Sequence, residues 1–458
     1  RSREQLRASC RLYLDGDLDF MFIAPERLSV PGFPEMLARR KPALIAIDEA
    51  HCISHWGHDF RPDYRLLGER IPLLRPAPVI ALTATATPLV QDDIVKQLGM
   101  KTARRFIRGF RRTNIAIEVM EVRSGERGAT LARLLSDKNM RPAIVYAPTR
   151  KKTDELAAEL AECYPTVAYH AGLTSEKREE AQTAFLEGRA EVIVATIAFG
   201  MGIDKPDVRA VIHTALPSSI ESYYQEIGRA GRDGQPARAV LMHSYSDRRL
   251  HLFLHDKNYP DEAVLLKIHR SLNSEAAPRQ TLMENIGMDP ELFETALDKL
   301  WVHGGASVTP DEKVSRGNTE WRKPYKEQSE HRLNQLDEIS RYAGNYSCRM
   351  KNLVAHFGDN SDSGADCGIC DFCRPHKAVG VQYREPARLE LAALTNAVRI
   401  LEADGHRGLH GLYQEACAGL GLSRSEFDRL LDAMLTDPIQ YVKRSEEHTS
   451  ELQSLAYL

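Results

Sequence analysis

Six short apolar runs occur in the first half of the chain, in two sets of three: 19–24, 43–47 and 79–82, then 143–147, 191–195 and 210–214. Polar residues bound each run, and helical patterns lie between several of them. Short buried runs of this kind are typical of parallel strands that are covered on both faces. The alternation predicts two α/β lobes with parallel sheets, an incomplete one over residues 1–107 and a second over residues 108–258.

After about residue 260 the pattern becomes helical. An apolar stripe at helical spacing runs along residues 292–301, and a Gly-Gly pair ends that helix. A hairpin-like stretch, 306–317, follows it. Two helices with a following hairpin are similar to a winged-helix module, which we expect at 259–324 and, in truncated form, at 388–443. The apolar stripes themselves predict core packing.

The composition is that of an ordinary globular protein, with 43% hydrophobic and 27% charged residues. No apolar run approaches the roughly 20 residues that a membrane helix needs, so we expect no membrane association. The net charge of −3 argues against a basic coat over the whole surface. Nucleic-acid contacts are therefore expected from local patches, such as the arginine-rich segment 104–112. The cysteine usage indicates a reducing compartment, with the cytoplasm as the default.

Both ends of the chain depart from the pattern between them. The first apolar run begins with nothing complete before it, and residues 444–458 resemble a translated sequencing adapter. We leave this last segment out of the fold prediction as a non-native tail. The sequence is expected to be a fragment of a longer gene.

An acidic pair, Asp48 and Glu49, directly follows the apolar run that ends at Ile47, and His51 comes two residues later. In open α/β sheets ligands bind at the carboxyl ends of the strands, so this pair is expected where a nucleotide binds. Asp48 can hold Mg²⁺, which takes one or two carboxylates together with phosphate and water. Glu49 can orient or deprotonate the water that attacks a γ-phosphate.

Two further loops follow strand-like runs. The hydroxyls of Thr83 and Thr85 can bond to the acidic pair and report whether phosphate is present; the alternative is a threonine-rich turn. The second loop, residues 195–207, is called the glycine loop. Its Gly202 and the glycine two residues before it would let backbone amides approach a phosphate. Asp204 could meet a ribose or Arg232. Taken alone, each loop is also explained as an ordinary turn.

The string Gln225–Gly234 contains two arginines, Arg229 and Arg232, at the spacing of one helical turn. We expect them to project from the same face of a helix. A planar guanidinium group suits phosphate bidentately and can act as an arginine finger. Such a pair is ordinarily solvated surface, but the glycines between the arginines favour close approach of a ligand, and we prefer the functional interpretation.

A segment rich in aromatic residues, 51–64, continues from the acidic pair without helical or strand periodicity, so it predicts a loop. Bases of a single strand can stack on Trp56 or Phe60 with Arg61 near phosphate, which grips DNA without sequence preference. Attached to the catalytic carboxylates, such a loop could couple DNA occupancy to ATP hydrolysis. The alternative is an aromatic-capped turn packed into the core.

Four cysteines cluster late in the chain, at Cys348, Cys367, Cys370 and Cys373. Four thiolates satisfy the tetrahedral geometry of Zn²⁺, and the close spacing of the last three suits a metal knuckle. An iron–sulfur cluster is the main alternative, because four cysteines can hold either. We expect a structural zinc in a helical domain over residues 325–377.

The chain closely resembles a RecQ-family DNA helicase. The resemblance rests on motifs that occur in this order: the acidic pair with His51 (the acidic box), the aromatic loop, the threonines, the glycine loop and the arginine string. The resemblance covers about residues 19–377. The aromatic loop and the cysteine cluster separate it from RNA helicases that share the acidic box. It implies two tandem RecA-like lobes, the cofactors ATP, Mg²⁺ and Zn²⁺, and ATP-driven 3′ to 5′ unwinding of single-stranded and partly duplex DNA in repair and recombination.

The resemblance also implies residue roles. Asp48 resembles the magnesium carboxylate, Glu49 the general base and Arg232 the arginine finger. The other residues expected in the catalytic set are His51, Gln225 and Arg229. The DNA-sensing loop is expected to use Ser54, Trp56, His58, Phe60 and Arg61.

The chain departs from the family pattern in two ways. It contains no G-x-x-x-x-G-K-[ST] phosphate-binding loop, which would lie before residue 1, so we expect negligible hydrolysis by this chain alone. The insert at 259–324 stands before the cysteine cluster, whereas better-known members carry the winged helix after it. Two alternatives stay open: a DNA-binding module without catalysis, whose lobes are a scaffold, and an RNA helicase, which stimulation by RNA rather than DNA would reveal.

Overall fold

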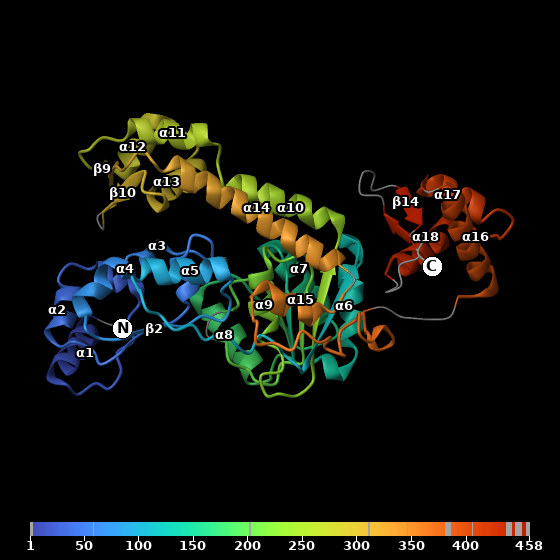
Figure 1. Ribbon diagram of the computed structural model, residues 1–458, viewed down its shortest axis with the longest axis horizontal. Helices are drawn as coiled ribbons and strands as arrows, with labels where there is room; N and C mark the ends of the chain where they lie inside the picture. Colours follow the sequence, from blue (N-terminus) through green and yellow to red (C-terminus); the bar gives the residue numbers. More distant parts are fainter. Residues whose placement is uncertain are drawn as a thin grey trace. The chain divides into compact units, whose positions relative to one another are not determined.

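The computed structural model describes nine stretches of the chain, namely residues 3–57, 59–200, 203–309, 312–345, 347–380, 386–404, 406–436, 442–444 and 451–454. The chain divides into two compact units, Arg1–Ile369 and Cys370–Leu458. Figure 1 labels their elements. Within the described stretches, no helix combines the length and apolar character that crossing a membrane requires.

A six-stranded parallel sheet forms the second lobe. Its strands lie in the order β3-β8-β7-β4-β6-β5. All residues of three strands are buried: β4 (Ala143–Tyr146), β6 (Val192–Ala195) and β7 (Ala210–His213). These three were expected from their apolar runs and are confirmed. The remaining three were missed: β3 (Ile115–Glu121), β5 (Thr166–Tyr169) and β8 (Ala237–His243).

Helices of the second lobe lie between its strands. Glycine or polar residues bound them, and Thr149 and Thr174 cap two of them by accepting backbone N–H groups. The helices are α6 (Arg127–Leu135), α7 (Arg150–Ala161), α8 (Ser175–Leu186) and α9 (Ile220–Ile227). Covering helices explain why the central strands read as unbroken apolar runs.

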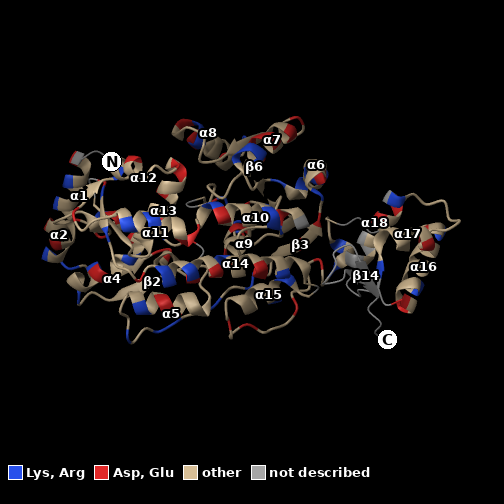
Figure 2. Cartoon of the chain, turned by 90° about the horizontal axis from the view of Figure 1, so that it is seen from above, with Lys and Arg blue, Asp and Glu red and all other residues tan. Residues whose placement is uncertain are grey.

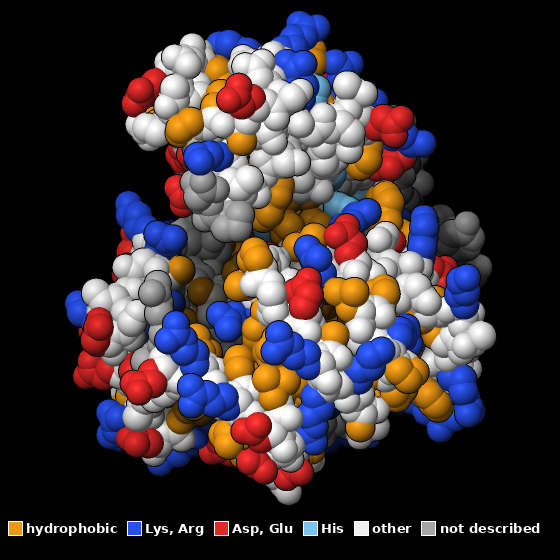
Figure 3. All heavy atoms as spheres, turned by 90° about the vertical axis from the view of Figure 1, so that its left-hand side faces the viewer, with side chains coloured by type: hydrophobic (Ala, Val, Ile, Leu, Met, Phe, Trp, Pro, Cys, Tyr) orange, Lys and Arg blue, Asp and Glu red, His pale blue; other side chains and the backbone are white. Residues whose placement is uncertain are grey.

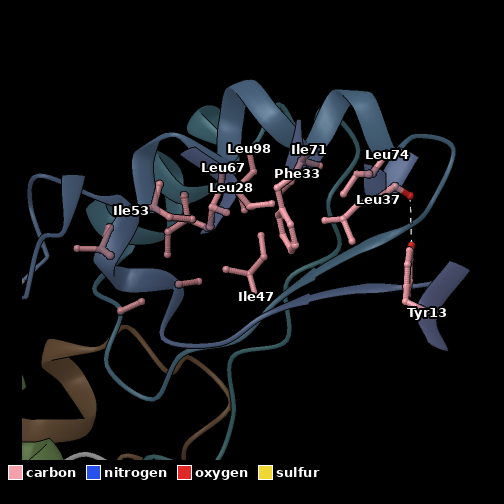
Figure 4. Packing of buried hydrophobic residues seen from close by; sticks show 14 residues of the cluster. Tyr13, Leu28, Phe33, Leu37, Ile47, Ile53, Leu67, Ile71, Leu74 and Leu98 are labelled. Atoms are coloured by element: carbon pink, nitrogen blue, oxygen red, sulfur yellow. Dashed lines mark hydrogen bonds between the residues drawn. The ribbon is translucent and has the colours of Figure 1, made fainter. Parts of the chain in front are cut away.

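The first lobe has a small parallel sheet of two strands, β1 (Ile45–Ile47) and β2 (Val79–Ala81). Its helices are α1 (Arg3–Asp15), α2 (Phe33–Arg39), α3 (Pro62–Arg65), α4 (Leu67–Arg70) and α5 (Pro88–Gln97). Figure 4 shows the core between them, in which Phe33, Ile47 and Leu67 converge. At its edge, the Tyr13 hydroxyl donates to the Leu37 carbonyl oxygen at 3.3 Å.

The expected strand at 19–24 is wrong. This segment has no strand structure, and the side chains of Phe20 and Phe22 are 80% and 97% exposed. A strand needs a hydrogen-bonding neighbour as well as apolar residues, and among the described residues β1 pairs with β2 rather than with this segment. The apolar run is present in the sequence, but it does not show whether a neighbouring strand is available for pairing.

A helical insert follows the second lobe. It contains α11 (Glu262–Ser271), β9 (Ala277–Pro278), α12 (Arg279–Ile286), α13 (Pro290–Val302), β10 (Ala306–Val308) and β11 (Lys313–Arg316). The strands form an antiparallel sheet in the order β10-β11-β9. Phe293, Leu297 and Leu300 of the expected apolar stripe are fully buried, whereas Trp301 is 37% exposed.

Two long helices lead to and from this insert. They are α10 (Tyr245–Asn258) and α14 (Arg322–Gly344), which run side by side, and α15 (Arg349–His356) follows α14 (Figure 1). Lys and Arg are interspersed with Asp and Glu along such helices (Figure 2).

Among its described residues, the second unit has three α-helices and a small antiparallel sheet. The helices are α16 (Arg388–Asp404), α17 (Leu409–Ala416) and α18 (Arg424–Thr436), packed around Leu401, Leu412 and Phe427. The strands are β12 (His406–Gly408), β13 (Val442–Arg444) and β14 (Glu451–Ser454), in the order β12-β14-β13. Strand β14 lies in the segment 444–458 that the sequence analysis set aside.

Candidate active site

The acidic pair lies at the carboxyl end of β1. Glu49 adopts a left-handed backbone conformation, with φ of 49°, directly after Asp48. Its amide donates to Asp48 Oδ1 at 2.9 Å. Next to it, the Ala50 amide donates to the Leu82 carbonyl oxygen at 2.9 Å, which ties this turn to the end of β2. The chain thus leaves the two strands at one edge of the sheet with both carboxylates there.

His51 connects the acidic pair to the threonine loop. Its Nδ1 lies 3.0 Å from Thr83 Oγ1 and 3.3 Å from Glu49 Oε2. Thr83 Oγ1 in turn accepts the Thr85 amide at 3.3 Å. The Thr85 side chain itself is buried, and its hydroxyl makes no hydrogen bond among the described residues. The link from the acidic pair to this loop therefore runs through His51 and Thr83.

A cavity of about 1510 Å³ opens between the two lobes. The first lobe contributes Glu49 and Thr83 to its wall, and the arginine-rich segment after α5 also lines it. From the second lobe come residues of the glycine loop and the arginine string: Gly200, Ile203, Asp204, Tyr224, Gln225, Gly228, Arg229 and Arg232. Residues from distant motifs thus face one space that is large enough for a nucleotide.

The expected helix does not extend to the two arginines. Helix α9 ends at Ile227 with Gly228 as its cap, so Gln225 is helical but Arg229 and Arg232 lie in the turns that follow. Gly231 has φ of 54°, which continues a turn and not a helix. The prediction of one shared helical face is wrong because the interleaved glycines end the helix.

The two arginines have different surroundings. Arg232 Nη1 donates to the Ile203 carbonyl oxygen at 3.0 Å and to Asp204 Oδ1 at 2.9 Å, as the sequence suggested for Asp204. Arg229 is 7% exposed and lies against Gly200, where a Cβ atom would approach Arg229 Nη2 to 2.9 Å. Glycine at position 200 therefore makes room for a buried guanidinium group. Gly202 lies outside the described residues.

Charges from both lobes act on Glu49. Burial raises the pKa of its carboxyl group, and the Asp48 carboxylate raises it further. The guanidinium groups of Arg61 and Arg229 lower it. A carboxylate with a raised pKa is a stronger base, and Arg229 of the arginine string is one of the cations that lower this pKa.

The aromatic loop begins with a buried turn. Ser54 is fully buried, and its hydroxyl donates to Asp93 Oδ2 of α5 at 2.7 Å while accepting the Trp56 amide at 3.2 Å. We expected Ser54 at the DNA surface; instead it anchors the loop to the first lobe. His58 lies outside the described residues.

The rings and charge of this loop are partly exposed. Arg61 pairs with Asp59, with Nη2 2.6 Å from Oδ2. Phe60 stacks on His55 with ring centroids 4.2 Å apart. Trp56 and Phe60 are each half-buried, which leaves part of each ring accessible.

Residues far along the chain hold the loop, and the sequence analysis missed them. His331 and Arg332 of α14 bond to the backbone carbonyl oxygens of Trp56 and Gly57, each at 2.9 Å. The His303 ring lies parallel to that of His55, with centroids 5.6 Å apart. Figure 3 shows the hollow between the insert, above, and the first lobe, below, with histidine side chains at its edge. No local sequence signal marks these contacts.

The four cysteines come together. One sulfur atom from each of Cys348, Cys367, Cys370 and Cys373 lies within 4.8 Å of the others. The Cys367 amide donates to Cys348 Sγ at 3.1 Å, and Cys370 Sγ lies 3.5 Å from Cys373 Sγ. Four sulfur donors at this spacing, one of them accepting an N–H group, fit a tetrahedral zinc ion.

Two family models match the chain. Residues 126–234 match the helicase conserved C-terminal domain, and residues 312–374 match RecQ zinc-binding. The first match covers the glycine loop and the arginine string, and the second covers all four cysteines. The second match supports zinc, and not an iron–sulfur cluster, at the cysteines.

Relatives with known activities match over about half of the chain. The ATP-dependent DNA helicase RecQ of Pasteurella multocida is 40% identical over 270 residues, which are 58% of this chain and 42% of that protein. The protein of the same name from Bacillus subtilis is 42% identical over 250 residues, covering 54% and 42%. Among solved structures, S. cerevisiae Dbp5 bound to RNA and ADP BeF3 is 20% identical with a TM-score of 0.40, covering 50% of this chain and 61% of that one.

The chain thus spans about two fifths of the length of these two helicases. The residues that match the two family models contain the arginine string and the cysteine cluster. Over the matched residues the chain is therefore similar to ATP-dependent DNA helicases of the RecQ family.

Proposed function

We propose that the protein acts as an ATP-dependent DNA helicase that moves 3′ to 5′ along single-stranded DNA and unwinds partly duplex DNA in repair and recombination. One observation carries this proposal: Glu49 of the first lobe and Arg229 and Arg232 of the second line the same cavity. An ATP-driven motor of two lobes needs a base on one wall and cations on the other. Closing and opening of the lobes would then drive translocation.

Each residue of the candidate site has its own proposed role in ATP hydrolysis. ATP, bound with Mg²⁺, supplies the phosphoanhydride bond that is broken. Asp48 would hold the magnesium ion through its carboxylate, and Glu49, whose pKa is raised, would accept the proton of the attacking water. Arg229 and Arg232 would neutralise the charge that develops on the transferred phosphoryl group. His51 and Thr83 would relay phosphate occupancy to the loop that contains Thr85.

DNA would be gripped by the aromatic loop. Trp56 and Phe60 keep part of each ring accessible for stacking on bases, and Arg61 lies beside them for a phosphate. Because the loop begins at His51, two residues after Glu49, DNA binding and hydrolysis can influence each other. His331 and Arg332 would keep the loop in the conformation that senses DNA.

The insert is proposed to be a winged-helix module. Its order of helix, strand, two helices and two strands supports this assignment. We extend the assignment to residues 388–443, and expect duplex DNA as the partner of both modules. The cysteines would hold a structural zinc ion. Four of the eight cysteines in one metal cluster fit a reducing compartment such as the cytoplasm better than a disulfide scaffold.

ATP hydrolysis with and without single-stranded DNA tests the function. The chain is compared as it stands and with a P-loop-bearing first-lobe segment from a RecQ relative joined in front. Stimulation by DNA that Glu49→Gln and Arg232→Ala each abolish, while nucleotide binding persists in Glu49→Gln, is the expected result. A folded, zinc-loaded protein that binds DNA without hydrolysis in either form would favour a non-catalytic DNA-binding module. Stimulation by RNA alone would favour an RNA helicase.

A further inference from the structure

The segment that joins the two lobes, which contains residues 110–112, contacts the cysteine-rich region at 348–373. Arg111 forms a bidentate ion pair with Asp362, with Nε–Oδ1 and Nη2–Oδ2 distances of 2.6 and 2.7 Å. Its Nη2 also donates to the Ala365 carbonyl oxygen at 2.8 Å. Both partners lie within five residues of Cys367 in the sequence, and both side chains of the pair are largely buried. A planar, bidentate pair of this kind fixes orientation as well as distance.

The next residue is fastened to the arginine string. Arg112 Nη1 donates to the Gly228 carbonyl oxygen at 3.1 Å, and Nη2 donates to those of Ala230 and Gly231 at 2.9 and 3.1 Å. These three carbonyl groups belong to the turns from which Arg229 and Arg232 project. A single guanidinium group thus holds the backbone on both sides of Arg229.

An aromatic stack supports the same connection. Phe110 lies parallel to Phe357, just after α15, with centroids 4.6 Å apart and an angle of 8° between the rings. Phe110 also accepts a hydrogen bond at its carbonyl oxygen from the Tyr224 hydroxyl of α9, at 2.7 Å. Three successive residues, 110–112, therefore contact either the cysteine-rich region or the arginine string.

We propose that Arg111 and Arg112 are positioning residues that make the placement of Arg229 and Arg232 depend on metal occupancy of the cysteine cluster. A bound metal fixes Cys367 and with it the backbone that presents Asp362 and Ala365 to Arg111. Without the metal, this backbone gains freedom, Arg111 loses its fixed partner, and Arg112 no longer holds the three carbonyl groups. The consequence for catalysis rests on the proposed function; the structural coupling does not.

Amide hydrogen exchange in the whole chain tests the coupling without any hydrolysis. The Gly231 amide donates to the Val208 carbonyl oxygen at 2.9 Å and reports on the arginine turns. Removing zinc with a chelator is expected to speed exchange at residues 228–232 by about tenfold, the scale of a lost charge-assisted hydrogen bond. Exchange in β4 should stay unchanged, which shows that the lobe remains folded.

Two variants assign the effect to the proposed connection. In zinc-loaded protein, Arg111→Met and Asp362→Asn should each reproduce the fast exchange, and the double variant should add nothing further. Zinc removal should then have little additional effect. Arg248→Met is the matched control, because Arg248 pairs with Asp337 at 2.9 Å between α10 and α14. It should keep the wild-type response to zinc.

Wild-type exchange at 228–232 after zinc removal would overturn the proposal, as would full zinc sensitivity in Arg111→Met. Where hydrolysis is measurable, zinc removal and Arg111→Met should lower kcat with little change in KM, because the arginines act on the transition state. Coupled exchange together with no hydrolysis in the P-loop-bearing protein would reject the proposed function and leave the coupling intact.

Discussion

His331 donates a hydrogen bond from Nε2 to the backbone carbonyl oxygen of Trp56, and its ring meets the indole edge-on with centroids 5.3 Å apart. The two residues are 275 positions apart in the sequence. Burial lowers the pKa of His331, so the ring is neutral near pH 7 and carries its single proton on the nitrogen that faces the carbonyl group. A helix that follows the insert therefore sets the shape of the aromatic loop.

We predict that His331→Ala reduces stimulation of ATP hydrolysis by single-stranded DNA about fivefold, the scale of one neutral hydrogen bond. The rate without DNA should change little, because the nucleotide cavity keeps all its lining residues. His331→Gln is the matched variant, since its amide nitrogen can replace Nε2 as the donor, and it should restore most of the stimulation. Equal losses in both variants would contradict a role for this hydrogen bond. The measurement is the rate of ATP hydrolysis at increasing concentrations of single-stranded DNA.

Metal analysis of the purified protein should find about one zinc ion per chain and no visible absorbance. Cys348→Ser should lose the ion, because three thiolates and a weaker donor hold zinc less tightly. Cys163→Ser, at an exposed cysteine outside the cluster, should keep it. Iron with a visible absorption band would contradict the zinc assignment.

Glu221 makes stability depend on pH in acid. Burial alone would raise the pKa of this carboxyl group, but hydrogen bonds from His356 and others lower it to about 2. The His356 Nε2 lies 2.9 Å from Glu221 Oε1 and joins α9 to α15. A lowered folded-state pKa stabilises the protein above pH ~4.5, and that contribution disappears as the pH falls towards 2.

Glu221→Gln should therefore lower the melting temperature clearly at pH 6, with a stability loss on the order of 3 kcal/mol. The difference from wild type should narrow steadily as the pH falls from 5 to 2.5. Glu155→Gln, at an exposed residue of α7, serves as the control and should show a small difference throughout. A gap of constant size between pH 6 and 2.5 would contradict the pKa shift as its cause.

In the second lobe, the sequence predicted those strands that are buried at every position. Strands β4, β6 and β7 are buried at every position, so their runs are unbroken. Strand β3 was missed because Glu118 and Glu121 interrupt it. Glu118 is nevertheless 2% exposed, since it pairs with Arg238 on β8. That pairing depends on a residue 120 positions away, which no local pattern contains.

In the candidate site too, features carried by neighbouring residues could be predicted, and contacts between distant residues could not. Asp48 and Glu49 could be found because a strand end and two carboxylates are adjacent in the sequence. The placement of Arg229 and Arg232 on a helix was wrong, because glycines that favour close approach also end helices. Arg112 was expected only as part of a nucleic-acid-binding patch, although its guanidinium group bonds to backbone carbonyl groups, and His331 was not found at all. Their functions consist of contacts with backbone carbonyl groups of distant segments, which leave no trace in residue type or spacing.

A methyl group added at Gly200 would meet the Arg229 guanidinium group. The added Cβ atom would lie 2.9 Å from Arg229 Nη2, closer than real contacts allow. Arg229 is buried, so its end has little room to move away. In protein that carries a P-loop, Gly200→Ala should lower kcat by up to about 100-fold, the effect of misplacing a catalytic group by roughly 1 Å. Gly125→Ala is the control, because nothing lies within 4 Å of its added atom. Wild-type kcat in Gly200→Ala would show that Arg229 acts from another position, and a raised KM with unchanged kcat would place its role in nucleotide binding.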